Sequence, residues 1–328
     1  MQSKTNWQDK TILLTGGTGS FGQAFAKTIL KKKPSHLRIF DCDEFAQFEM
    51  IKNFKSKDVS YLLGRVEDKD RLQRAMEGVD IVVHAAALKQ VPILEYNPFE
   101  AVKTNILGSQ TVIDCALDLG VKKVMLISSD KAVSPINLYG ATKMVAEKIF
   151  IQANSYAAGK NTALAVVRYG NVMASRGSVV PTFIEQAKRG TLTVTDERMT
   201  RFWITLEQGV NFVIKSLETM RGGEIFIPKI PSVKIMDLAR AVSPRAKIKI
   251  VGLRPGEKMH ELLISQDEAI HSLDFGDYFT IVPEFVSWGK VYYQNSEKGL
   301  EAGFYYSSDN NGTWLDIGDI KKLLSQLD

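Results

Sequence analysis

The sequence is poor in cysteine and histidine and contains no long apolar run. Its 328 residues include two cysteines, Cys42 and Cys115, and four scattered histidines. Two cysteines form no disulfide framework, and no cluster has metal-ligand spacing, so we expect no metal site. No segment approaches the roughly 20 apolar residues that span a bilayer, and the polar N-terminus does not resemble a signal peptide. These absences favour a protein of the reducing cytoplasm without membrane insertion.

The charge of the chain is mildly positive and not concentrated. The formal net charge is +5, and the densest basic run is Lys31-Lys32-Lys33. Such a run is typical of a solvated helix end, where lysine interacts favourably with the helix dipole. We therefore expect no nucleic-acid partner. A small anionic ligand such as a nucleotide diphosphate suits this surplus better.

Short apolar segments alternate with helical patterns in the first half of the chain. This alternation predicts an α/β fold, a Rossmann-like doubly wound parallel sheet in a dinucleotide-binding domain over residues 1–171. The expected strands are residues 11–15, 37–41, 59–64, 80–87, 122–128 and 162–169. The expected helices are residues 21–31, 68–77, 98–119 and 139–153.

The second half is punctuated by glycine and proline. We expect residues 172–328 to form mostly a smaller, mixed α/β substrate-binding lobe, with some segments returning to the first domain. Residues 292–311 have a loop-like composition, and residues 314–327 have an amphipathic helical pattern. The segments assigned to the lobe are 180–188, 205–219, 225–228 and 235–242.

A glycine-rich turn follows the first expected strand and opens a helix. Its three glycines, Gly16, Gly19 and Gly22, have the spacing G-x-x-G-x-x-G. Glycine lets the backbone approach a pyrophosphate, and the helix N-terminus supplies amide donors. The context predicts a dinucleotide site rather than an ordinary tight turn. The turn residues expected to contact the cofactor are Gly16, Thr18, Gly19, Ser20, Phe21 and Gly22.

Two further features bear on this cofactor. Asp41 ends the second expected strand, where an acid binds ribose hydroxyls and repels a 2′-phosphate, which favours NAD over NADP. Ala85 and Ala86 end the fourth strand, and such small side chains let a flat cofactor lie against the backbone. We interpret the preceding His84 as a structural hydrogen-bonding residue.

The most informative motif is Tyr139-x-x-x-Lys143, preceded by an apolar strand that ends near Ser129. On a helix the Tyr and Lys share one face. A phenol whose pKa is lowered by Lys143 and a nicotinamide ring can take the proton of a sugar hydroxyl while its carbon gives up hydride. Ser129 would hydrogen-bond the same oxygen. This context favours hydride transfer over a plain surface helix.

Asp130 and Lys131 add an acid and a base that hydride transfer alone does not need. A neutral Lys131, its pKa depressed by burial, could remove the C5 proton of a 4-keto sugar. A protonated Asp130 could give a proton to the leaving C6 hydroxyl. The residues alone leave open whether the pair eliminates water or forms a local ion pair.

Long stretches match one family. They are residues 15–22, 84–92, 129–132, 135–143, 168–172, 175–181, 199–203 and 254–258. On these stretches the chain resembles the inverting UDP-N-acetylglucosamine 4,6-dehydratases, extended short-chain dehydrogenase/reductases of the polysaccharide-biosynthesis group that start pseudaminic acid biosynthesis. The resemblance implies a homo-oligomeric enzyme with a tightly bound, recycled NADP or NAD and UDP-N-acetylglucosamine as substrate.

The resemblance also implies a reaction cycle. Tyr139 and the cofactor oxidise C4, Lys131 abstracts the C5 proton, and Asp130 assists loss of the C6 hydroxyl. Hydride then returns to C6 and C5 is reprotonated on the opposite face, giving UDP-2-acetamido-2,6-dideoxy-β-L-arabino-hexos-4-ulose. The motifs add Val66, Lys89, Asn105 and Val172 as cofactor contacts. They imply UDP-sugar contacts at Lys89, Asn171, Val180, Thr195, Met199, Arg201, Arg254 and Glu257.

Two departures from the family pattern concern the adenosine end of the cofactor. The family has Ser-Arg-Asp-Glu where this chain has Asp41-Cys42-Asp43-Glu44, and an Asp where this chain has Arg65. Arg65 could stack on adenine or reach a phosphate, so the choice between NAD and NADP stays open. Alternative functions are a retaining dehydratase, a C4 epimerase or reductase, and a non-catalytic NAD(P)-binding regulator.

Overall fold

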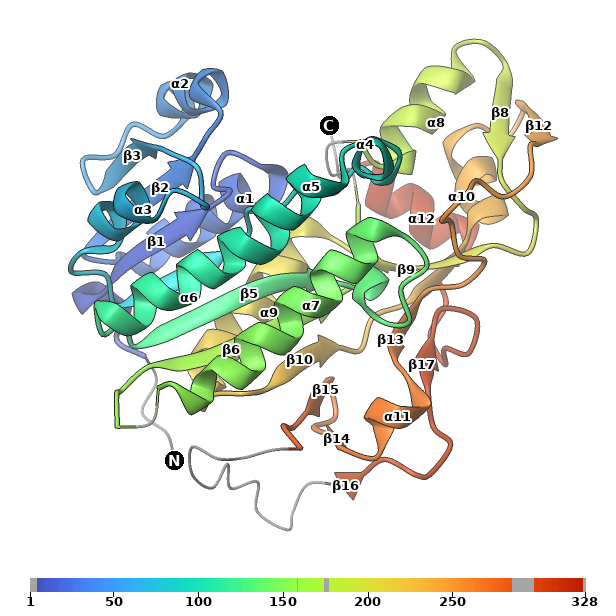
Figure 1. Ribbon diagram of the computed structural model, residues 1–328. Helices are drawn as coiled ribbons and strands as arrows, with labels where there is room; N and C mark the ends of the chain where they lie inside the picture. Colours follow the sequence, from blue (N-terminus) through green and yellow to red (C-terminus); the bar gives the residue numbers. More distant parts are fainter. Residues whose placement is uncertain (1–4, 158, 174–176, 285–297, 327–328) are drawn as a thin grey trace.

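The computed structural model describes residues 5–157, 159–173, 177–284 and 298–326. Within this part of the chain, a ten-stranded sheet has the order β3-β2-β1-β4-β5-β6-β10-β15-β14-β16 (Figure 1). The strands from β3 to β10 are parallel, and the last three are antiparallel. The predicted Rossmann-like parallel sheet is confirmed. Its strands are β1 (Thr11–Thr15), β2 (His36–Asp41), β3 (Val59–Leu63), β4 (Ile81–His84), β5 (Lys123–Ser129), β6 (Ala163–Tyr169), β10 (Ile225–Pro228), β14 (Ser272–Asp274), β15 (Tyr278–Ile281) and β16 (Lys298–Gly299).

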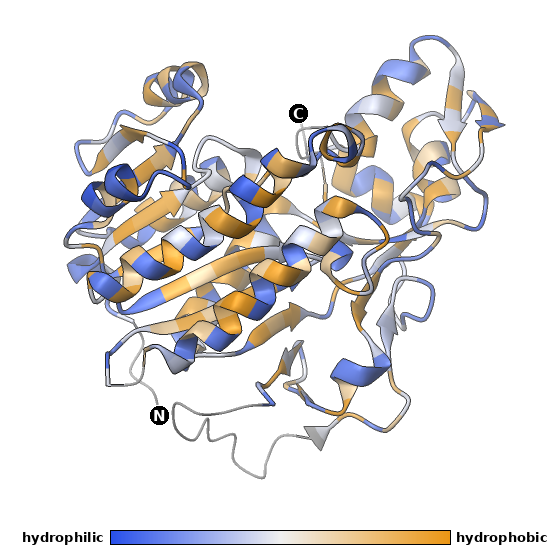
Figure 2. Ribbon diagram, viewed as in Figure 1, coloured by the Kyte–Doolittle hydropathy of each residue, from blue (hydrophilic) through white to orange (hydrophobic). Residues whose placement is uncertain are grey.

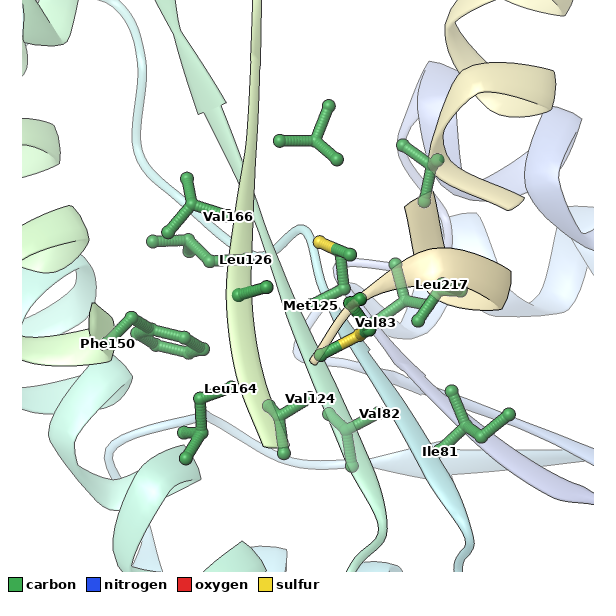
Figure 3. Packing of buried hydrophobic residues seen from close by; sticks show 14 of the residues in the cluster. Ile81, Val82, Val83, Val124, Met125, Leu126, Phe150, Leu164, Val166 and Leu217 are labelled. Atoms are coloured by element: carbon green, nitrogen blue, oxygen red, sulfur yellow. The ribbon is translucent and has the colours of Figure 1, made fainter. Parts of the chain in front are cut away.

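The central strands are apolar because both of their faces are covered (Figure 2). Side chains of one strand alternate between the two faces, so Leu126 lies on the side of Phe150 and Met125 on the side of Leu217 (Figure 3). Phe150 comes from helix α7 (Leu138–Gln152) and Leu217 from helix α9 (Leu206–Thr219). The layers are therefore helix, sheet and helix, as a parallel sheet requires.

Helices α1 (Ser20–Ile29) and α9 pack together on one face of the sheet, and α3, α6 and α7 lie on the other (Figure 1). The expected helix 98–119 is interrupted by a π-helical turn, η3 (Val102–Leu107). The remaining helices of this half are α2 (Glu44–Asn53), α3 (Lys69–Met76), α4 (Val91–Tyr96), α5 (Pro98–Ala101) and α6 (Gly108–Asp118). Short 3-10 turns are η1 (Trp7–Asp9), η2 (Leu30–Lys32), η4 (Asp130–Ala132) and η5 (Ala153–Ser155).

A smaller lobe has its own apolar core, which includes Val180, Phe183, Trp203 and Leu238. Its elements lie together at one end of the sheet (Figure 1). They are β7 (Asn171–Val172), α8 (Val179–Ala187), β8 (Thr191–Val194), β9 (Thr200–Ile204), β11 (Ser232–Lys234), α10 (Ile235–Val242), β12 (Lys247–Ile250) and α12 (Ile317–Leu324). Between this lobe and the sheet edge lie β13 (Leu262–Ile264), α11 (Gln266–Ala269) and β17 (Tyr306–Ser307).

Two segments lie elsewhere than expected. The sequence predicts residues 205–219 and 225–228 in the smaller lobe, but α9 packs on α1 and β10 extends the parallel sheet beside β6. The reason is burial, because every residue of β10 is buried and needs cover on both faces. Of the expected loop 292–311, residues 292–297 lie outside the described part, and the rest contains β16 and β17.

The C-terminal helix predicted over residues 314–327 is observed as α12, with Asp316 as its N-cap. No helix in the described ranges combines the length and apolar character needed to cross a membrane.

Helix α7 approaches the backbone of the loop after β5 very closely. Its N-cap Asn137 accepts a hydrogen bond from Gly140 N at 2.8 Å. A Cβ at Gly140 would overlap the carbonyl oxygen of Lys131. Glycine at this helical position therefore fixes the distance between the first turn of α7 and the Asp130-Lys131 loop.

We expect Gly140→Ala to destabilise the protein by about 2 kcal/mol or more, because the added methyl group forces the loop away from α7. Gly209→Ala is the matched control, since a Cβ there meets only Ile204 Cδ1 at 3.9 Å. That helical substitution should instead stabilise by about 0.5–1 kcal/mol. Urea unfolding of both variants measures the difference, and equal effects would contradict the close packing.

Candidate active site

The glycine-rich turn between β1 and α1 is packed too tightly for side chains. Gly16 has a φ of +67°, and a Cβ on it would lie 2.6 Å from Ala86 N. A Cβ on Gly22 would overlap the carbonyl oxygen of Gly17. The helix N-terminus and the end of β4 thereby form a bare backbone cradle, which fits a pyrophosphate group.

A cavity of about 710 Å³ opens beside this cradle, at the carboxyl ends of the parallel strands. The strand order reverses there, between β1 and β4, which is the usual place for a ligand in such sheets. Most sequence-predicted cofactor and catalytic residues line it. They are Gly16, Thr18, Gly19, Ser20, Phe21, Gly22, Asp41, Arg65, Val66, Ala85, Ala86, Lys89, Ser129, Asp130, Lys131, Tyr139, Lys143 and Val172.

Lys143 lies one helical turn after Tyr139, so both side chains reach the cavity. Its Nζ donates to Ile127 O at 2.7 Å, and burial lowers the pKa of Lys143 to about 8 although Glu147 opposes this. Burial raises the pKa of Tyr139, against the charge of Lys131 and a hydrogen bond with Ser129. The described residues alone do not lower the pKa of Tyr139, and its lowering by Lys143 together with a nicotinamide ring stays a prediction.

Lys131 lies between two carboxylates. Its Nζ is 3.2 Å from Asp130 Oδ1 and 3.1 Å from Glu261 Oε1. Burial disfavours the ammonium, but the charges of Asp130 and Glu261 outweigh burial and raise the pKa of Lys131. The expectation of a depressed Lys131 pKa is therefore wrong: the side chain rests as an ammonium.

The pKa of Asp130 is also raised, but here burial is the cause. This residue is almost fully buried, and burial raises its pKa despite the neighbouring Lys131 charge. The Ser129 hydroxyl donates to Asp130 Oδ1 at 2.9 Å, and Oδ2 has no hydrogen-bond partner among the described residues. This direction agrees with the expected protonated acid.

Sequence reasoning missed Glu261. It precedes β13, at the end of the segment that follows the matched stretch 254–258, and its side chain is buried. Arg201 Nε lies 3.7 Å from its carboxylate. A single glutamate next to a strand has no distinctive local pattern, so the signal that reveals it is the spatial contact with Lys131.

The segment 254–261 is brought against the start of α7. Asn137 donates to Gly256 O at 2.8 Å, and Lys258 Nζ donates to the carbonyl oxygen of Val133. Arg201 is buried and donates to the carbonyl oxygens of Lys258 and Met259 at 2.9 and 3.0 Å. Arg201 therefore fixes the backbone of this segment through two hydrogen bonds.

The predicted substrate contacts divide into two groups. Lys89 and Asn171 line the cavity, and Asn171 Oδ1 is buried without a hydrogen-bond partner in the described chain. The other six do not border this cavity within the described residues. They are Val180 and Met199 in the core of the smaller lobe, the buried Thr195 and Arg201, the exposed Arg254, and Glu257 beside Arg201. Ser175 and Arg176 of the matched stretch 175–181 lie outside the described residues.

Asn105 and His84 hydrogen-bond to residues next to the backbone cradle. Asn105, in the π-helical turn, accepts from Leu88 N at 2.8 Å and donates to Leu88 O at 2.9 Å. His84 hydrogen-bonds Thr15 at 2.7 Å, and burial lowers its pKa to about 3, as suits the structural interpretation. Asn105, expected as a cofactor contact, thus holds the backbone of the loop after β4 and is not among the residues that line the cavity.

At the adenosine end, Asp41 is held by the glycine-rich turn. Its Oδ2 accepts from Thr18 N at 3.0 Å and from Thr18 Oγ1 at 2.7 Å. Arg65 lies across the cavity rim with 67% of its side chain exposed, 3.7 Å from Glu67. A fixed negative charge and a loosely held positive charge therefore border the same end of the cavity.

Comparison with known proteins assigns the chain to a family. Residues 12–283 match the family described as polysaccharide biosynthesis protein. The chain belongs to this family. A Campylobacter jejuni protein named UDP-N-acetylglucosamine 4,6-dehydratase (inverting) is 50% identical over 325 residues, covering 96% of this chain and 97% of that protein. The resemblance inferred from the motifs is therefore confirmed.

Two other relatives extend the comparison. A Rickettsia akari protein named UDP-glucose 4-epimerase is 40% identical and covers 98% of this chain, with 96% of its own length matched. The X-ray structure of Pen from Bacillus thuringiensis is 39% identical, has a TM-score of 0.91, and covers 98% of this chain and 99% of its own. The Pen structure thus shares the whole architecture of this chain, including the smaller lobe.

Lys143→Met removes a buried charge and should raise stability below pH 8 by on the order of 1–3 kcal/mol, since the ammonium is disfavoured in the folded state. Between pH 8 and the ordinary value of 10.5, the folded amine is neutral while the unfolded one is still charged, so the gain declines and then disappears. Urea unfolding on both sides of pH 8 measures this. A variant less stable than the parent at neutral pH contradicts it.

Proposed function

We propose that this chain is an NAD(P)-dependent UDP-N-acetylglucosamine 4,6-dehydratase that inverts C5. The observation that supports the proposal best is the presence of two pairs in one cavity: Tyr139 with Lys143, and Asp130 with Lys131. The first pair suits oxidation of a hydroxyl, and the second suits elimination of water. About 50% identity over nearly the full chain to a named dehydratase of this type supports the same class.

The cavity fits a nicotinamide dinucleotide. The bare backbone at Gly16 and Gly22 suits the pyrophosphate, and Asp41 suits a ribose. The unpartnered Asn171 Oδ1 offers an acceptor to a ligand hydroxyl. When bound, a nicotinamide ring provides temporary storage for the hydride, so the reaction needs no net oxidant.

Each side chain then has one task. Tyr139 takes the proton of the C4 hydroxyl, and Ser129 hydrogen-bonds the same oxygen. The resulting 4-keto group makes the C5 proton acidic, and Lys131 removes it. Asp130 gives its proton to the leaving C6 hydroxyl, which departs as water and leaves a C5=C6 double bond. Return of the hydride to C6 and of a proton to C5 then gives the 6-deoxy-4-keto product. Lys131 can accept the C5 proton only as an amine, so its ammonium must first release a proton.

The finer parts of the proposal follow from the family resemblance. The product would be UDP-2-acetamido-2,6-dideoxy-β-L-arabino-hexos-4-ulose, the first intermediate of pseudaminic acid biosynthesis. The support for inversion is the name of the Campylobacter jejuni relative. A rival activity, C4 epimerisation, is favoured by the name of the Rickettsia akari relative, and it has no evident use for Asp130 and Lys131.

Reaction with UDP-N-acetylglucosamine in D2O separates these activities. We expect the product to have lost one water and to carry one deuterium at C5. Its NMR couplings should report the inverted centre. Lys131→Ala should reduce dehydration at least about 1000-fold, since the base is missing, while the cofactor stays bound. An epimer without loss of water, or normal turnover by Lys131→Ala, overturns the assignment. Cofactor binding without any turnover would instead indicate a regulator.

The adenosine end favours NAD. The Asp41 carboxylate is fixed at the cavity edge and repels a 2′-phosphate, and Cys42 stands where the family has an arginine. We expect cofactor released from the purified protein to be mainly NAD. The double substitution Asp41→Ser with Cys42→Arg should raise NADP affinity about tenfold or more. If the parent instead contains NADP and the Arg65→Ala variant does not, Arg65 binds the 2′-phosphate.

A further inference from the structure

The backbone around Glu261 is fixed from the segment after β17. Glu261 N donates to Ser308 Oγ at 2.9 Å, and Ser308 N donates to Glu261 O at 2.8 Å. Ser308 Oγ also hydrogen-bonds Thr200 at 2.7 Å. These contacts fix the backbone of Glu261 without the participation of Lys131, so the position of Glu261 is set by the fold.

The side chain of Glu261 is 3% exposed, whereas that of Lys131 is 26% exposed and faces the cavity. The two residues are 130 positions apart in sequence, and their contact joins the loop after β5 to the segment before β13. Glu261 Oε2 has no hydrogen-bond partner in the described chain. A buried carboxylate that makes one hydrogen bond to a lysine is oriented toward that lysine.

The charged and titratable groups that face Lys131 come from several elements. They are Asp130 from its own turn, Glu261, Arg201 of β9, Tyr139 of α7, and Lys258 of the same segment as Glu261. Asp130 must be protonated to act as the acid. In that state Glu261 supplies the negative charge that holds the ammonium, against Arg201 and Lys258.

We propose that Glu261 is a positioning residue for the dehydration: its ion pair fixes Lys131 Nζ beside Asp130 and controls how much of Lys131 is present as the free amine. This inference rests on the proposed function for its catalytic meaning. The ion pair itself can be tested without any substrate, so the two proposals can fail separately.

The first test measures the amine directly. The cofactor-containing protein is treated with an amine-selective acylating reagent over a pH series, and labelling of Lys131 is followed by peptide mass spectrometry. In Glu261→Gln we expect Lys131 to react about tenfold faster near pH 8, because loss of the carboxylate charge favours the neutral amine. Equal labelling rates in the variant and the parent overturn the proposal.

Two further variants control for folding and for charge. Glu268→Gln removes another carboxylate of the same region that pairs with an arginine, Arg168, and should leave Lys131 labelling unchanged. Glu261→Asp keeps the charge but withdraws it by one methylene, and should give intermediate labelling even if Glu261→Gln does not fold. Labelling in Glu261→Asp that matches the parent, or a change in Glu268→Gln as large as that in Glu261→Gln, contradicts a specific role.

Turnover provides the second readout. The acid limb of the kcat profile should move about one pH unit lower in Glu261→Gln, with KM changed less than about threefold. A purely structural residue would lower activity at every pH without moving the limb. If the parent does not dehydrate the sugar nucleotide but the labelling difference remains, the proposed function fails and the ion-pair role stands.

Discussion

The close packing of α7 against the turn after β5 is the constraint on which the site depends. Gly140 leaves no room for a side chain next to the Lys131 carbonyl oxygen, and Lys143 donates to Ile127 O from the next turn. Tyr139 directly precedes Gly140 and lies one helical turn before Lys143. The helix can thus hold one catalytic pair beside the other without any flexible connection, because both pairs are attached to the same strand end.

The same helix is anchored further along by a buried ion cluster. Arg168 on β6 pairs with Glu147 on α7, and with Glu268 on α11 at 2.8 Å. A buried cluster of this kind contributes little net stability, but removal of one partner leaves an uncompensated charge. It therefore ties α7 and α11 to β6. Sheet, helix and lobe segment meet at the cavity in one arrangement.

Burial gives the titratable groups of the site their different states. At Lys143 the charge of Glu147 only partly opposes burial, so the pKa of Lys143 is lowered. At Lys131 the charges of two carboxylates outweigh burial, so the pKa of Lys131 is raised. Burial raises the pKa of the Asp130 carboxyl, against the charge of Lys131. The site thus combines Lys143, which releases its proton readily, with Lys131, which holds its proton strongly.

Local patterns in the sequence were sufficient for the parallel sheet, the glycine-rich turn and the shared face of Tyr139 and Lys143, because each depends on spacing within a few residues. Tertiary structure alone decided that β10 joins the main sheet and that Glu261 meets Lys131 across 130 positions. It also decided the state of Lys131, since a pKa depends on which distant charges lie within a few ångströms. Sheet order and loop meeting points are long-range properties, and no short motif encodes them.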